Sequence, residues 1–156
     1  MPIISGEGGG GGGPEVGSGA LASLQGSVPA FTSGGTFALD TEEKDTDNYW
    51  VVGTPGQFTI PAGLGGLFVV TVAAQFGADA AILYGEIALI PDTAPNAYAP
   101  MAKDLLAGNA WRGCLTAVTY AAAGENLVFT ALFSGPASVS LQSTTWASIA
   151  RIGSLA

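Results

Sequence analysis

Short runs of β-branched and aromatic residues alternate with glycine- and proline-rich turns along the chain from residue 30 onward. Over residues 137–142, Val139 and Leu141 fall on one side of an extended backbone, and the serines and glutamine beside them fall on the other. Such alternation predicts a half-buried strand. The whole pattern is typical of a β-sandwich or barrel, with strands expected at residues 30–39, 48–52, 57–60, 66–77, 81–90, 110–122, 126–134, 137–142 and 145–152.

One predicted strand is apolar on both faces. Residues 67–72 read Leu-Phe-Val-Val-Thr-Val, so we expect a second sheet to cover one face and a neighbouring subunit to cover the other. Helix is poorly supported, and its best candidate is residues 99–106, about two turns long without clear caps.

The first 29 residues differ from the rest of the chain. Gly8 to Gly13 is an unbroken glycine run, which cannot hold regular structure by itself. We therefore expect an N-terminal arm over residues 1–29 and a β domain over residues 30–156. The arm is either a flexible linker or a segment ordered on a neighbour. In the second case its anchors are Ile3, Ile4, Leu21 and Leu24.

Composition points to an assembly. Hydrophobic residues make up 48% of the chain and charged residues 10%, against about 25% charged in an average globular protein. A lone domain needs a charged surface to stay in solution. We therefore expect other subunits to cover part of this one.

The charge balance restricts the partners. The chain has 12 acidic and 4 basic residues, for a net charge of −8, which disfavours binding to nucleic acid or to an anionic membrane surface. Residues 64–90 are apolar but interrupted by Thr71, Gln75, Asp79 and Glu86, so we expect strands there and not a membrane span. The first residues show no basic and apolar signal-peptide pattern.

Several segments occur in a characteristic order. Phe37-Ala-Leu-Asp-Thr-Glu is followed by Phe58-Thr-Ile-Pro, then Gly66-Leu-Phe-Val-Val, then Gln75-Phe76, and the chain closes with Thr144-Thr-Trp-Ala-Ser-Ile-Ala-Arg-Ile-Gly. Over residues 30–153 this order resembles the C1q/TNF-like jelly-roll family, and in particular its versions in phage and bacterial structural proteins. Residues 79–110 depart from the family's usual form.

The resemblance implies an all-β jelly-roll sandwich that packs as a homotrimer around an apolar axis. Such relatives serve as capsid decorations, head fibres, or tail and spike tips, and an N-terminal arm attaches them to the particle. The residues expected to pack in the core or the trimer interface are Phe37, Trp50, Phe58, Ile60, Phe68, Val70, Phe76, Phe129, Phe133, Trp146 and Ile149.

The sequence lacks a residue type on which catalytic sites commonly depend. The chain has no histidine, which excludes Ser-His and Cys-His nucleophiles and histidine-based metal sites. The acidic residues Asp40, Glu42, Glu43, Asp45 and Asp47 form either a solvated loop or a Ca²⁺ site. No other cofactor is expected.

Two aromatic residues and the lone cysteine are further candidates. Tyr98 and Trp111 lie near predicted loops, where they could contact a glycan. Cys114 lies in an apolar stretch and is expected to be a small buried hydrophobe.

The sequence therefore predicts a non-enzymatic virion structural protein, a homotrimeric capsid decoration or head fibre that contacts other virion proteins through its arm. The alternative is a receptor- or glycan-binding tail or spike tip on the same fold, with a host surface molecule as partner. Short predicted loops favour the first hypothesis.

Overall fold

A computed structural model describes residues 18–25, 34–36, 38–92, 102–104, 108–136 and 138–154. In these ranges the regular structure consists of β-strands. They are β1 (Gly19–Ser23), β2 (Gly34–Thr36), β3 (Thr41–Asp45), β4 (Gln57–Thr59), β5 (Gly66–Ile82), β6 (Tyr84–Pro91), β7 (Ala102–Asp104), β8 (Gly108–Ala121), β9 (Asn126–Ser134), β10 (Val139–Leu141) and β11 (Trp146–Ser154).

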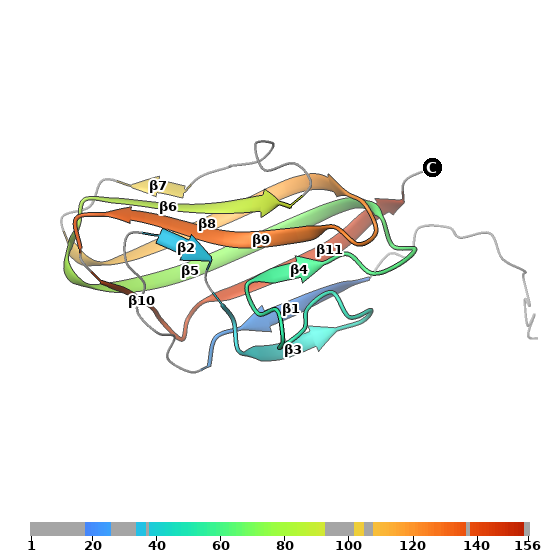
Figure 1. Cartoon of the computed structure of the whole chain (residues 1–156), viewed down its shortest axis with the longest axis horizontal. Helices are drawn as coiled ribbons and strands as arrows, with labels where there is room; N and C mark the ends of the chain where they lie inside the picture. Colours follow the sequence, from blue (N-terminus) through green and yellow to red (C-terminus); the bar gives the residue numbers. More distant parts are fainter. Residues whose placement is uncertain are drawn as a thin grey trace, which may run out of the picture.

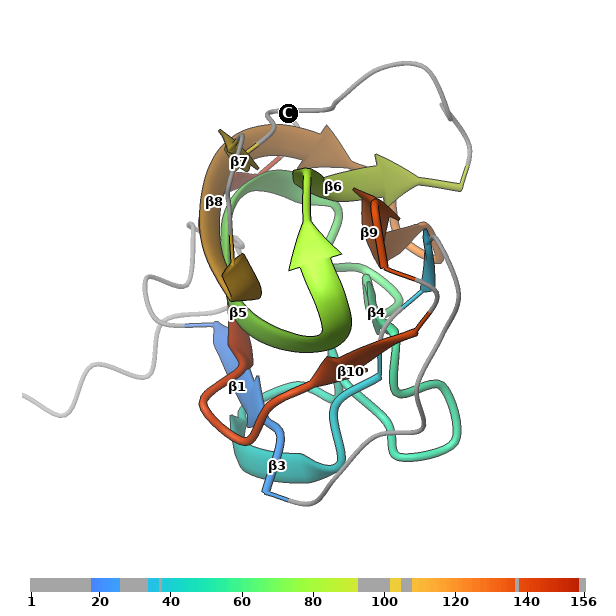
Figure 2. The same cartoon turned by 90° about the vertical axis from the view of Figure 1, so that its left-hand side faces the viewer.

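The strands form two antiparallel sheets. In the six-stranded sheet, β8 lies along one side of β5, and β10 and β11 lie along the other side, followed by β1 and then β3. In the five-stranded sheet, β9 lies at the centre, with β6 and then β7 on one side and β2 and β4 on the other. Viewed along the strands, the two sheets face each other as a sandwich (Figure 2).

Alternation along the strands builds the core between the sheets. In β5 every second residue from Gly66 to Phe76 is buried, and the same period holds along β8 and β9. Within this core Phe58 meets Phe129 edge to face, and Phe76 meets Phe133 in the same way. This is a favoured arrangement of aromatic rings.

A slot made by two glycines holds the largest core side chain. Trp111 on β8 is 1% exposed and stacks on Phe76. A Cβ atom added at Gly85 or Gly113 would lie 2.9 Å or 2.6 Å from the Trp111 ring, too close for a real contact. Glycine is therefore required at both positions because the indole occupies the space of a side chain.

The chain enters and leaves the sandwich at the same end. Gly19 at the start of β1 pairs with Ala150 in the middle of β11, and Ser154 at the end of β11 pairs with Gly66 at the start of β5. Figure 1 shows the beginning of β1 and the end of β11 at this one end. The turn between β5 and β6 lies at the opposite end (Figure 1).

The long central strands agree with the sequence pattern, whereas the first part of the chain differs. Residues 41–45 pair as β3 although their acidic side chains were expected in a loop, and residues 48–52, where a strand was expected, lie outside the strands. The helix expected near residues 99–106 is wrong over residues 102–104, which pair with β6 as β7. Pairing with an existing strand outweighed weak helix propensity there.

The predicted end of the arm is also wrong. Residues 19–23 form β1, which lies between β11 and β3 in the six-stranded sheet. Leu24 is buried in the core, and Leu21 is exposed on the sheet surface. Both belong to the β domain, and the described part of the domain begins at Ser18.

Candidate assembly surface

Among the described residues, nothing packs over one face of the six-stranded sheet. We call this the open face, and it is formed by the outward-pointing residues of β1, β5, β8 and β11. Cross-strand pairs cover it in rows, from Leu67 with Tyr120 at one end to Gln75 with Arg112 at the other. Over residues 66–77, 110–121 and 146–154, Arg112 is the one charged side chain on this face.

One end of the open face is apolar. Val118 and Tyr120 on β8 are 58% and 59% exposed, and they pair across the strands with Val69 and Leu67 on β5. Ile152, at a bulge near the end of β11, is 52% exposed. Contiguous apolar surface of this kind marks an interaction site. We call these residues the apolar end.

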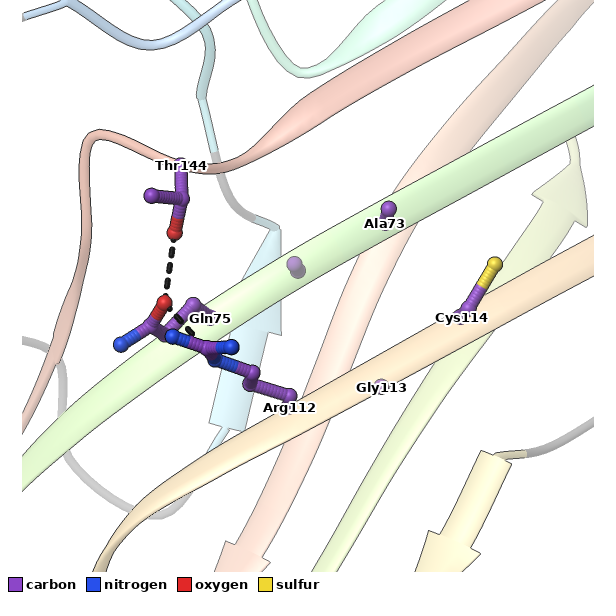
Figure 3. Close-up of a pocket in the computed structure, with 7 residues that line it drawn as sticks. Ala73, Gln75, Arg112, Gly113, Cys114 and Thr144 are labelled. Carbon is purple, nitrogen blue, oxygen red and sulfur yellow. Dashed lines mark hydrogen bonds between the residues drawn. The ribbon is translucent and has the colours of Figure 1, made fainter.

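Polar side chains pair with one another at the opposite end. The Gln75 side-chain carbonyl Oε1 accepts hydrogen bonds from Arg112 Nε at 3.0 Å and from Thr144 Oγ1 at 2.7 Å. Figure 3 shows these three side chains converging, with Ala73 and Cys114 further along the same two strands. All five residues line a shallow hollow. We call this the polar end. Thr71 and Thr116 join the two ends through a 3.2 Å contact between their hydroxyl oxygens.

The expectation that Cys114 is buried is wrong. Its side chain is exposed on the open face of β8. The buried positions in this part of the strand are the odd-numbered ones, among them Trp111, Gly113 and Leu115. One face of β8 therefore packs in the core, and the other, which carries Cys114, lies on the open face.

A second hollow lies across the sheet from β8. It is lined by Leu21, Ser23, Glu43, Trp146 and Ser148, and we call it the Trp146 hollow. Glu43 Oε1 accepts hydrogen bonds from Ser23 Oγ at 2.6 Å and Gln25 Nε2 at 3.0 Å. These bonds, chiefly that of Ser23, lower the pKa of the Glu43 carboxyl, so a carboxylate stands at the rim of the hollow.

The acidic residues expected to bind Ca²⁺ have separate structural partners. Asp45 accepts hydrogen bonds from the backbone N–H groups of Asp47 and Trp50, which holds the turn after β3. Asp40 accepts from the N–H of Gln25, and Glu42 is exposed on β3. Among the described residues no group of three or more potential ligands is gathered for a metal ion.

Asp47 belongs to a small polar cluster at the start of β1. Its Oδ2 accepts hydrogen bonds from Thr46 Oγ1 at 2.6 Å and Ser18 Oγ at 2.7 Å, and these bonds lower its pKa. Tyr49, whose hydroxyl lies 2.6 Å from Ser18 Oγ, is buried, and burial raises its pKa. The cluster fixes the first strand against the β3–β4 loop.

The residues expected to contact a glycan do not form a site in the described structure. Trp111 is buried against Phe76 and Phe133, so it cannot contact a ligand from solution. Tyr98 lies outside the described residues, as do Ile3, Ile4 and Phe37.

Most residues expected in the core or the trimer interface are buried within the single chain. They are Trp50, Phe58, Ile60, Phe68, Val70, Phe76, Phe129, Phe133 and Ile149. Trp146 is different, because it is 38% exposed on the open face. Val118, Tyr120 and Ile152 were not expected at an interface, although strict alternation over residues 110–122 would have placed the first two opposite Trp111.

Among the described residues, no helix has the length and apolar character that a membrane crossing requires. No protein-family model and no curated protein matches the sequence.

Solved structures do resemble this one. The globular domain of zebrafish complement 1qA protein superposes with a TM-score of 0.63 at 11% sequence identity, covering 88% of this chain and 99% of that one. Eiger TNF from S. frugiperda gives a TM-score of 0.56 at 12% identity, covering 89% of this chain and 94% of that one. With two antiparallel sheets in this arrangement, the chain has the C1q/TNF-like jelly-roll fold.

Proposed function

We propose that this chain is a non-enzymatic structural module that forms a homotrimer through its open face and decorates a virus particle. The observation that carries the proposal is the apolar end of that face. Val118, Tyr120 and Ile152 are each more than half exposed, beside the partly exposed Leu67 and Val69. Apolar surface left in water is costly, and its burial is the main favourable term in association.

The position of this surface supports a symmetric assembly. The other face of the same sheet is already used by the core, so the open face is the surface of this sheet that an identical chain can cover. Most homo-oligomers have closed symmetry, and three copies facing one axis would bury the apolar end together.

The virion role rests on the sequence resemblance to phage and bacterial structural proteins. It is supported by an arrangement in which β1 begins and β11 ends at one end of the sandwich (Figure 1). With an axis along the strands, the first strands of all copies begin on the same side of the assembly. That side is suited to attachment to a particle.

The mass of the full chain in solution tests the assembly. Light scattering should give three times the chain mass of 15.5 kDa, and a monomer at micromolar concentration would refute the homotrimer. The virion role is tested separately by mass spectrometry of particles purified from cultures of the source strain. Absence of the chain from those particles would refute that role and leave the trimer untouched.

The alternative is a receptor- or glycan-binding tip. One of the two aromatic residues expected to contact the ligand, Trp111, is buried and cannot do so. No described cluster of exposed aromatic residues takes its place, so we favour the structural role.

A further inference from the structure

The two edges of the six-stranded sheet place an arginine and a glutamate at nearly the same height along the strands. At one edge, Arg112 lies on β8, which among the described strands pairs in this sheet with β5 alone. At the other edge, β3 pairs among the described strands with β1 alone and carries Glu42, Glu43 and Lys44. Glu43 lines the Trp146 hollow, whereas Glu42 pairs with the buried Ala22 and Lys44 pairs with Leu21. Four strand spacings, roughly 19 Å, separate β8 from β3, so the two charges are too far apart to meet within one chain.

The strand register fixes the heights. One row of paired residues crosses the sheet from Cys114 through Ala73 and Trp146 to Ser23. Ser23 donates a hydrogen bond to Glu43, so the carboxylate stands near this row. Arg112 lies two residues further along β8, about 7 Å away, which is within the reach of an arginine side chain.

Rotation about an axis along the strands keeps every residue at its own height. Three sheets that turn their open faces to such an axis form a prism, and each corner joins the β8 edge of one copy to the β3 edge of the next. This contact is heterologous, because different surfaces of the two copies meet.

We propose that the Trp146 hollow of each subunit receives the β8 edge of its neighbour, with Arg112 of one copy facing Glu43 of the next. This inference rests on the proposed homotrimer and names its contact. Arg112 Nε donates a hydrogen bond to Gln75 Oε1. No carboxylate among the described residues forms an ion pair with this guanidinium. The hollow offers the complement, a carboxylate beside the exposed Trp146 ring, on which a guanidinium can stack.

The native cysteine provides a direct test. Cys114 is the only cysteine of the chain and lies in the same row as Ser23. In the full-length Ser23→Cys variant, mild oxidation should link Cys114 of one copy to the introduced thiol of the next, because the heterologous contact brings the β8 edge into the hollow. A non-reducing gel should then show covalent trimers, since two heterologous links per subunit close a ring.

A matched variant controls for chance collisions. Thr130→Cys places the new thiol on β9, at a part-exposed position on the outer side of the other sheet, and should yield no covalent trimer. Disulfides that stop at dimers in Ser23→Cys, or that form equally in Thr130→Cys, would overturn the proposed contact.

Charge exchange tests the ion pair itself. Arg112→Glu and Glu43→Arg should each weaken the trimer about ten-fold or more by placing like charges together, and the double variant should recover most of the loss. Equal weakening in the single and double variants would refute the pairing.

The two proposals fail differently. If light scattering finds a wild-type trimer but neither cross-linking nor charge exchange behaves as described, the homotrimer stands and this contact is wrong. If the wild type is a monomer, the homotrimer itself fails.

Discussion

The two ends of the open face lie on the same strands but differ in chemistry. At the apolar end, the side chains of Val118 and Tyr120 are largely exposed to solvent. At the polar end, Gln75, Arg112 and Thr144 satisfy one another through hydrogen bonds within the chain. The first end gains free energy mainly when another molecule covers it, whereas the second already forms hydrogen bonds within the single chain.

This contrast indicates which end should supply affinity and which should supply selectivity. Apolar burial is non-directional and scales with area. Charged and polar contacts contribute more to register and partner choice than to binding strength. We therefore expect the apolar end to hold the trimer together and Arg112, at the polar end, to set how the copies meet.

A charge placed at the apolar end should disturb assembly most. Tyr120→Asp should raise the concentration needed for assembly about 100-fold or more, because a buried unpaired carboxylate is costly. Light scattering over a dilution series measures this shift. Thr144→Asp at the polar end is the matched control and should change assembly less than about ten-fold. Equal effects at both ends would remove the distinction between them.

The next largest effect should come from a substitution in the core, at Gly113 beneath the polar end. Gly113→Ala should lower the free energy of unfolding by about 1–3 kcal/mol, because the new Cβ would lie 2.6 Å from Trp111 and 2.7 Å from Ile87. Denaturant unfolding at a fixed chain concentration measures it. Gly53→Ala, where a Cβ would meet nothing within 4 Å, should be close to neutral. A neutral Gly113→Ala would contradict the tight slot around the indole.

A smaller effect should separate folding from assembly. Asp45→Ala removes the acceptor for the N–H groups of Asp47 and Trp50, and should cost about 1–2 kcal/mol of stability, measured by denaturant unfolding. Because Asp45 pairs with Ala20, which is buried on the core side of the sheet, the trimer should persist under native conditions. Glu42→Ala on the same strand should change neither property, and loss of the trimer in Asp45→Ala alone would show that the turn contributes to the interface.

The weakest effect is a pH dependence. Hydrogen bonds from Thr46 and Ser18 lower the pKa of Asp47, so its stabilising contribution is present above the unfolded value of about 3.9 and is lost as the pH falls through the lower folded value. The denaturant midpoint should therefore decrease from about pH 5 to about pH 2 less steeply in Asp47→Asn than in the wild type. An unchanged slope in Asp47→Asn would show that these bonds do not persist in solution.

The β class and the central strands could be predicted from the local sequence alone. Period-two alternation in residues 126–134 and 139–141 follows from the pleat of a half-buried strand, and residues 66–77 indicated a strand with two apolar faces. The order of short segments also indicated the jelly roll, which the solved structures of the same fold confirm.

Which face of each strand is covered depended on the fold as a whole. Trp111 and Cys114 come from one predicted strand, yet the indole fills a glycine-lined slot in the core and the thiol lies on the open face. Residues 19–23 and 41–45 carry weak local signals, and they became strands because β11 offered an edge on which β1 and then β3 could pair. Local pattern specifies alternation along a strand, but burial depends on the second sheet, and pairing depends on partners that lie far away in the sequence.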